Sequence, residues 1–315
     1  MRAITARGAP VQDIQEVPAR AIRKLMIREI EAKVLLSHVK QPDSWFGLKY
    51  NMNLYRGCQH RCIYCDSRSE CYGLDNFDEE ILVKRNALGL LRKELASKRV
   101  KGTIGTGSMN DPYMPVETDL KLTGPALDII AEFRFPVHVM TKSDLVLRDL
   151  DALRQINQVY AAVTFTITTA DDRLGKVLEP GAPLVSDRFR AMQALANEGI
   201  RTGVAMMPLL PYIEDNEENI HRIVKQAQAH GASYIIPHFG MSLRDRQRAY
   251  YYDKLDQLFP GLRQKYERAF GNRCTCPVPN ADRLSDVFAR MCQEHGIRPG
   301  IEPYQPVTAT QMRLL

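Results

Sequence analysis

The sequence predicts an α/β fold built around a parallel β-sheet. Apolar segments of strand length alternate along the chain with segments whose apolar residues recur at helical spacing. Strands that alternate with helices in this way form parallel β/α units with right-handed crossovers. At 315 residues, of which 44% are hydrophobic, the chain is long enough to bury one large core. Such units either close into a barrel or spread as a doubly wound sheet.

The first 43 residues are polar and rich in arginine, and we expect them to form an N-terminal arm or helical layer. A helical pattern lies around residues 22–36. The positive charge of this segment is typical of a solvated face, and also of an arm that contacts nucleic acid.

The central region, residues 44–240, contains the predicted β/α units. Strands are expected at residues 46–54, 102–108, 137–141, 159–169, 202–209 and 234–239. Helices are expected at residues 81–96, 126–133, 147–155, 188–198 and 217–229. The first helix is indicated by leucine and isoleucine at near-helical spacing, and Gly199 and Gly231 end the last two helices.

Three cysteines in one short run, Cys58, Cys62 and Cys65, form a C-x-x-x-C-x-x-C motif just after the first strand. Three thiolates at this spacing can hold three irons of a cubane 4Fe-4S cluster and leave the fourth iron open. A structural zinc site usually has four ligands in two separated pairs, and no second C-x-x-C pair exists. His60 is a geometrically awkward fourth ligand because it lies between two of the cysteines.

Charge and cysteine usage favour a protein of the cytoplasm. The chain has 43 Lys and Arg against 37 Asp and Glu, a mildly basic balance that is weak support for a polyanionic partner. No apolar segment is long enough to span a membrane. Seven cysteines without a recognisable export signal fit a reducing compartment, so a disulfide is not expected.

Polar residues follow each predicted strand, where the functional residues of parallel α/β folds gather. They lie at 58–65, 108–111, 142–143, 166–171, 208–212 and His238. The cysteine run is therefore expected to face a ring of polar strand ends.

The segment YNMNLYRGC at 50–58, continuing through Cys62 and Cys65, resembles the radical S-adenosylmethionine (radical SAM) superfamily. Within it, the chain is similar to the spore photoproduct lyase-like branch, also described as DNA repair photolyase-like. The resemblance covers about residues 33–304 and includes DPYMPVE at 111–117, TKS at 141–143, LEP at 178–180, EGI at 198–200, and Cys276 with Pro279 and Asn280.

This resemblance implies a partial (β/α)6 TIM-type barrel with an N-terminal arm and a C-terminal helical extension. It also implies two cofactors, a 4Fe-4S cluster on Cys58, Cys62 and Cys65 and S-adenosyl-L-methionine on the open iron. One electron, from a reductant such as flavodoxin or ferredoxin, would cleave S-adenosylmethionine to methionine and a 5′-deoxyadenosyl radical that abstracts hydrogen from a substrate.

The resemblance places seven residues around S-adenosylmethionine. Lys142 would offset the charge of its carboxylate, because a buried carboxylate needs a cation or several donors. Thr166 falls where the lyases carry a serine, and the backbone of Tyr64 would meet adenine, flanked by the apolar residues 205–208. The full set is Tyr64, Ser108, Asn110, Asp111, Lys142, Thr166 and Pro208, with 108–111 near the methionyl ammonium; Asn-Asp-Pro is equally a turn signal. Glu179 and Arg188 are expected to form a structural polar link.

One position departs from the lyases. They carry a hydrogen-donating cysteine where this chain has Ser108, and a hydroxyl is a much poorer hydrogen-atom donor than a thiol. Thymine-dimer repair is therefore not expected. Tyr113 and Tyr212 are the candidate catalytic residues for relaying a hydrogen atom, although aromatic residues in such loops more often serve packing.

The C-terminal residues 241–315 interleave cations with aromatic residues. This pattern is typical of a nucleic-acid surface and equally of helices that cap the open side of a barrel. Cys274, Cys276 and Cys292, with Cys71, could hold an auxiliary cluster, but small buried cysteines are the commoner explanation. Two function classes stay open: a radical SAM enzyme of unidentified substrate, and a non-catalytic, metal-stabilised nucleic-acid-binding module.

Overall fold

The computed structural model describes residues 25–40, 43 and 45–306. Its main sheet has seven strands in the order β10-β9-β8-β7-β6-β3-β2. Their bounds are β2 (Leu36–His38), β3 (Tyr50–Met52), β6 (Ile104–Thr106), β7 (Val137–Thr141), β8 (Ala161–Thr166), β9 (Arg201–Met206) and β10 (Tyr234–Pro237). The six strands from β3 to β10 are parallel, and only β2 runs antiparallel to its neighbour. The sheet is open between β10 and β2, so the predicted partial barrel is confirmed and is not closed.

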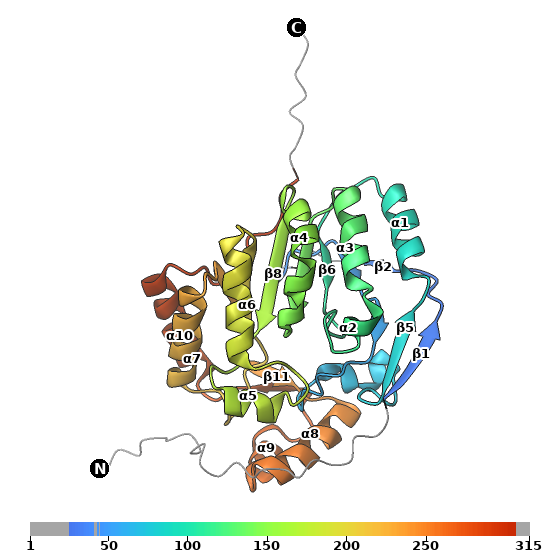
Figure 1. The fold of residues 1–315 in the computed structure, drawn as a ribbon. Coiled ribbons are helices and arrows are strands. Elements are labelled where there is room, and N and C mark those ends of the chain that lie inside the picture. Colours follow the sequence, from blue (N-terminus) through green and yellow to red (C-terminus); the bar gives the residue numbers. More distant parts are fainter. Residues whose placement is uncertain (1–24, 41–42, 44, 307–315) are drawn as a thin grey trace, which may run out of the picture.

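Helices cover one face of this sheet (Figure 1). Their bounds are α1 (Ala87–Ser97), α3 (Thr123–Glu132), α4 (Leu150–Asn157), α6 (Val185–Asn197) and α7 (Glu217–Ala229), and α10 (Ala281–His295) packs on α7. Two short helices, α2 (Glu117–Leu120) and α5 (Asp172–Leu178), lie with the 3-10 helix Asp144–Asp149 in the connections. No helix in the described residues combines the length and apolar character needed to cross a membrane.

The strands bury alternate residues against these helices because successive side chains point to opposite faces. Val139 and Phe165, both 0% exposed, lie in the large core between sheet and helices. Thr164 and Tyr234 belong to the opposite face, where their hydroxyls hydrogen-bond at 2.6 Å. Gly203 separates them, and a Cβ there would come within 2.3 Å of the Tyr234 ring, so this close packing requires glycine.

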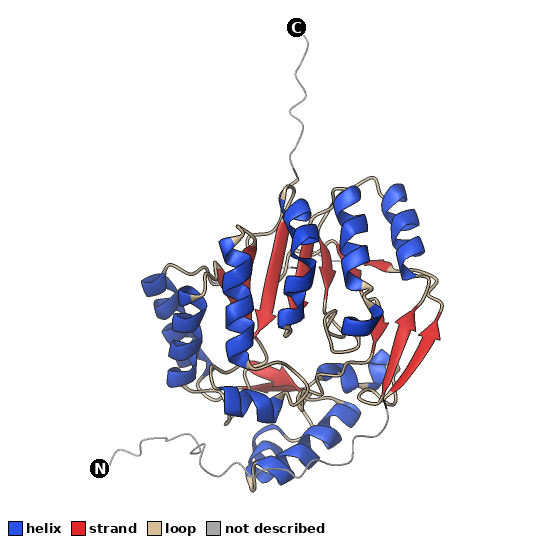
Figure 2. Ribbon diagram, viewed as in Figure 1, coloured by secondary structure: helices blue, strands red, loops and turns tan. Residues whose placement is uncertain are grey.

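A small second sheet, β1-β5-β4, lies beside the main one (Figure 2). It consists of β1 (Met26–Ile30), β5 (Glu80–Lys84) and β4 (Tyr55–Arg56). The helix predicted around residues 22–36 is therefore wrong in its described part, because main-chain pairing of β1 with β5 overrides the local pattern. Residues 22–24 lie outside the described residues.

The helix predicted at 81–96 is wrong in its first turn and a half. Residues 81–83 are buried on both faces of β5, between β1 and β4, so a continuous apolar run imitates part of a helical pattern. The helix starts at Ala87, after Asn86, whose side chain exchanges hydrogen bonds with the main chain of Ala32.

The C-terminal part begins with the hairpin β11 (Gly240–Ser242) and β12 (Thr275–Pro277), which encloses α8 (Asp245–Leu258) and α9 (Leu262–Phe270). In Figure 1, α8 and α9 lie beyond the carboxyl ends of the strands. Tyr251 and Tyr266, both fully buried, pack there in an apolar cluster that also contains Cys62 and Tyr64. The division of the chain at residues 43 and 240 stays a prediction.

Candidate functional site

The three motif cysteines lie on one loop between β4 and the 3-10 helix Asp66–Arg68; we call residues 57–65 the cysteine loop. Cys58 and Cys62 are buried and Cys65 is half-buried. Burial raises the pKa of Cys58 to about 12, and it also raises the pKa values of Cys62 and Cys65. All seven cysteines are free in this structure.

The donor set has the chemistry that an iron-sulfur cluster takes. Three cysteine sulfurs lie at 58–65 on one loop, and thiolates are the ligands of such clusters. Two cationic side chains lie beside the loop and oppose the rise in the pKa of the thiols. Lys142 lowers the pKa of Cys62, and Arg68 lowers the pKa of Cys65.

The carboxyl ends of four strands, β7 to β10, lie level with one another beside this loop. Thr166 of β8 pairs in register with Ala205 of β9, which in turn pairs with Ile236 of β10. Lys142 follows Thr141, the partner of Phe165, and therefore stands level with Thr166. The half-buried Pro208 comes two residues after β9 ends. The structure thus brings Lys142 and Thr166 together, as the sequence predicts.

Glu179 connects the cysteine loop to this level. The predicted link to Arg188 is confirmed as an ion pair of 2.5 Å in which both side chains are 1% exposed. Two further contacts could not be read from the sequence: the Tyr64 hydroxyl donates to Glu179 Oε1, and Lys142 Nζ lies 3.7 Å from the same oxygen.

The turn 108–111 is arranged around Asp111. Its carboxylate accepts hydrogen bonds from Thr141 Oγ1 at 2.7 Å and from the Lys142 main chain at 2.6 Å, and it pairs with His60 Nε2 at 3.0 Å. Burial by itself favours the neutral acid, but His60 and the hydrogen bonds lower the pKa of Asp111 to about 2. Asp111 therefore joins the cysteine loop to β7, and its predicted contact with S-adenosylmethionine stays a prediction.

Ser108 and Asn110 differ in exposure. Ser108 is exposed and exchanges hydrogen bonds with the Asn51 side chain at 2.7 and 3.1 Å. Asn110 is buried, and its Nδ2 has no hydrogen-bond partner within the described part of the chain. Both ring nitrogens of His60, expected to be an awkward fourth metal ligand, face protein groups. Nε2 faces Asp111, and Nδ1 lies 3.2 Å from the Gly181 carbonyl.

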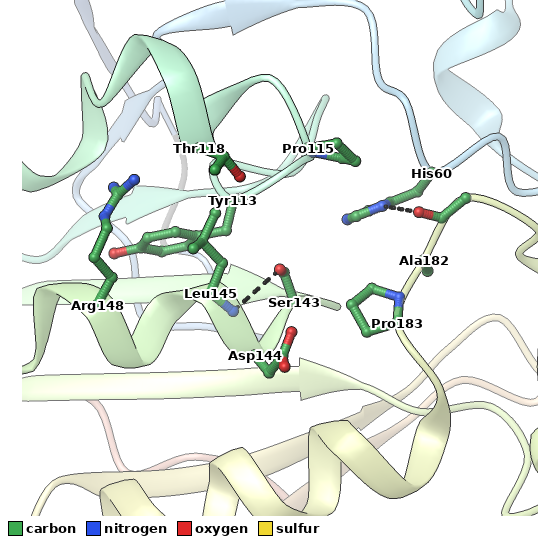
Figure 3. A pocket seen from close by; sticks show the side chains of 11 residues that line it. His60, Tyr113, Pro115, Thr118, Ser143, Asp144, Leu145, Arg148, Ala182 and Pro183 are labelled. Atoms are coloured by element: carbon green, nitrogen blue, oxygen red, sulfur yellow. Dashed lines mark hydrogen bonds between the residues drawn. The ribbon is translucent and has the colours of Figure 1, made fainter.

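The two candidate tyrosines lie outside the level of Lys142 and Thr166. Tyr113 is buried and lines a pocket of about 530 Å³ between α2, the 3-10 helix Asp144–Asp149 and the loop before α6 (Figure 3). Tyr212 packs against Tyr266, with ring centroids 5.7 Å apart, and Lys265 Nζ stands 3.8 Å from its ring centroid. Their contacts are those of packing residues, and a relay role stays a prediction for both.

Several basic residues of the C-terminal part make contacts within the protein. Arg246 pairs with Asp75 at 2.6 Å, and Arg248 donates to three main-chain carbonyls. Gln247, fully buried, donates to the Tyr64 carbonyl at 2.9 Å. Cys276 and Cys292 lie in different apolar clusters, while Cys274 and Cys71 are exposed.

The model of the Radical SAM superfamily matches residues 52–224, so this chain belongs to that superfamily. The matched region contains the cysteine loop, the four parallel strands β6 to β9 and the last residue of β3. The predicted superfamily is thereby confirmed.

Relatives match much of the chain. An uncharacterised protein of Mycobacterium tuberculosis is 26% identical over an alignment that covers 98% of this chain and 95% of the relative. An uncharacterised protein of Methanocaldococcus jannaschii is 35% identical, covering 62% of this chain and 71% of the relative. The Radical SAM Nalpha-GlyT isomerase of Pseudomonas phage M6 is 24% identical over 47% of this chain and 30% of its own.

The fold is that of spore photoproduct lyase. The lyase complexed with dinucleoside spore photoproduct superimposes with a TM-score of 0.64 at 16% identity, covering 86% of this chain and 81% of that one. A lyase variant with bound S-adenosylmethionine and the same dinucleoside gives a TM-score of 0.65 at 15% identity, covering 91% and 87%.

Proposed function

We propose that this protein is a radical SAM enzyme whose Cys58, Cys62 and Cys65 hold a 4Fe-4S cluster with one open iron. The observation that carries the proposal is the position of these thiols on one loop beside the strand-end level of Lys142 and Thr166. When both cofactors are bound, they supply one-electron cleavage of S-adenosylmethionine to methionine and a 5′-deoxyadenosyl radical.

The chain's own residues bind and orient in this proposal. The Lys142 ammonium, 15% exposed, has donors to offer a methionyl carboxylate, and the Tyr64 main chain meets the adenine. Asn110 can accept from the methionyl ammonium through its side-chain oxygen, and its Nδ2 is a buried donor without a partner among the described residues. A small reductant such as flavodoxin or ferredoxin supplies the electron.

The substrate is a molecule from which hydrogen is abstracted, and nucleic acid is the first class to screen. The solved lyases of this fold bind a dinucleoside spore photoproduct. We do not propose thymine-dimer repair, because the sequence resemblance assigns the exposed Ser108 to the position at which a hydrogen-donating cysteine is expected in the lyases. The alternative of a non-catalytic nucleic-acid module has less support, since several of the tail's cations and tyrosines make internal contacts.

Replacing Cys62 by Ala tests the proposal. After anaerobic reconstitution and reduction with dithionite, wild-type protein should form 5′-deoxyadenosine from S-adenosylmethionine, and the variant should form none. Cys71→Ala, on an exposed cysteine six residues beyond the loop, is the control and should retain wild-type yield. Retained cleavage in Cys62→Ala, or a zinc-only wild-type protein without iron and sulfide, would overturn the proposal.

A further inference from the structure

One buried carboxylate, Glu179, contacts three separate elements near the cysteine loop. It lies directly after α5 and is 1% exposed. Its Oε1 accepts a hydrogen bond from the Tyr64 hydroxyl and lies 3.7 Å from Lys142 Nζ, while its Oε2 is 2.5 Å from Arg188 Nη1. Both carboxylate oxygens therefore have partners. Oε1 faces Tyr64 and Lys142, and Oε2 faces Arg188.

Arg188 extends this network to the end of β8. Its Nη1 donates to the Thr166 carbonyl at 3.0 Å, and its Nε and Nη2 donate to the Pro183 carbonyl at 3.2 and 2.8 Å. The planar guanidinium holds these acceptors in a fixed geometry. Glu179 thus reaches Thr166 through Arg188.

The segment that carries Glu179 is attached to the cysteine loop through its main chain as well. Ile63 N donates to the Leu178 carbonyl at 2.9 Å, and Gly181 N donates to the His60 carbonyl at 2.9 Å. A Cβ at Gly181 would stand 2.1 Å from the Gln59 carbonyl, so this approach requires glycine. The carboxylate and the loop therefore form one rigid unit.

Glu179 faces cations on two sides. Burial alone would favour the neutral acid, but Arg188, Lys142 and the Tyr64 hydroxyl lower the pKa of Glu179, so it is ionised. The Lys142 ammonium also faces Asp111 and Cys62, and Glu179 is therefore one of several groups that hold it.

We propose that Glu179 is a positioning residue for S-adenosylmethionine, an inference that rests on the proposed function. Through direct contacts it fixes the Lys142 ammonium and the Tyr64 side chain, and through Arg188 it fixes the end of β8 at Thr166. These are three of the positions assigned to the cofactor, and they come from separate elements. Glu179 acts through them and does not contact the cofactor itself.

Substitution of Glu179 by Gln tests this role on the full chain with its cluster reconstituted. Iron and sulfide content reports loading, and equilibrium dialysis reports the affinities for S-adenosylmethionine and for its decarboxylated analogue. We expect a loaded variant whose affinity for both ligands falls about tenfold or more, because displaced binding groups can cost up to about a hundredfold. Lys142→Ala should instead weaken S-adenosylmethionine alone, since the analogue lacks the carboxylate.

Glu117→Gln is the matched control. Glu117 is also fully buried and bonded to a tyrosine and an arginine, Tyr55 and Arg148, but it touches none of the positions assigned to the cofactor. Its variant should bind S-adenosylmethionine with wild-type affinity. An equal loss in this control would overturn the inference, because the effect would then be general destabilisation.

Glu179→Asp decides the question if the Gln variant fails to fold. Aspartate keeps the charge beside both cations but shortens the side chain by one methylene, so a positioning role still predicts weaker binding. Wild-type affinity in a loaded Glu179→Gln or Glu179→Asp protein would overturn this inference alone. Wild-type protein that loads iron and binds no S-adenosylmethionine would overturn the proposed function and this inference together.

Discussion

At the residue scale, Glu214 is a buried acid whose ionisation opposes folding. It is 0% exposed in the loop after β9, and one carboxylate oxygen accepts from the Leu210 main chain at 3.1 Å. Burial raises the pKa of Glu214 from 4.5 to about 8. Between these two values the folded state holds a proton that the unfolded state has lost, so stability from this group is present at low pH and is lost as pH rises toward 8.

We predict that Glu214→Gln removes this pH dependence. The slope for one such group is about 1.4 kcal/mol per pH unit, so the variant should gain stability relative to wild type as pH rises from 5.5 to 8. Chemical denaturation at several pH values measures this difference. Glu218→Gln, on an exposed neighbour, should show a constant difference. If the difference in unfolding free energy between Glu214→Gln and wild type did not change with pH, the prediction would be contradicted.

At the element scale, Gln247 fastens α8 to the cysteine loop. Its Nε2 donates to the Tyr64 and Ser242 carbonyls, both at 2.9 Å, and its Oε1 accepts from Arg244 N at 2.8 Å. Asp245, at the start of the same helix, accepts from the Ser69 hydroxyl at 2.8 Å. The first turn of α8 therefore orders the loop that carries the cysteines.

We predict that Gln247→Leu destabilises the protein and loosens the loop. Leucine has a similar size but leaves buried main-chain groups without partners, at about 1–3 kcal/mol for each group. Denaturant midpoints and the rate of iron loss to a chelator measure the two effects. Gln257→Leu makes the same change on the exposed side of α8 and should leave both unchanged. Equal iron loss in the two variants would contradict a role for Gln247 at the loop.

Elements whose pattern reflects their own burial could be predicted from the sequence. The strand Val137–Thr141 and the helix Glu217–Ala229 match their expected bounds, because a short isolated apolar run predicts a buried strand and helical periodicity records which face a helix buries. β1 and β5 could not be predicted. β1 is mostly exposed and depends on main-chain pairing, and only two residues separate the apolar run of β5 from the helix that starts at Ala87. The cysteine motif was readable because its ligands are adjacent in sequence.

At the scale of the whole molecule, the site joins segments that are far apart in the chain. Glu179 lies 115 residues from Tyr64, and Gln247 lies 183 residues from it. Local sequence patterns carry no record of contacts between distant segments. The Glu179–Arg188 link, between residues nine apart, could be predicted, but its extension to Tyr64 and Lys142 could not. The cysteine loop in turn lies between two apolar clusters, one with Cys62 and the α8–α9 tyrosines and one with Cys58, Leu74 and Phe77.

This position predicts that cluster loading stabilises the whole fold. The unfolded chain rarely holds its metal ligands in a preformed site. Metal binding to the folded state therefore adds to the free energy of folding. We expect iron-loaded wild-type protein to melt at least about 5 °C above protein stripped by a chelator, a shift that corresponds to roughly 3 kcal/mol for a chain of this size. Scanning calorimetry under anaerobic conditions measures both forms. Cys62→Ala should melt at one temperature with or without the chelator, whereas Cys292→Ala, in the separate core between sheet and helices, should keep the difference. Equal melting temperatures for loaded and stripped wild-type protein would contradict this prediction. They would show that the two apolar clusters order the cysteine loop and that the iron-sulfur cluster adds no stability.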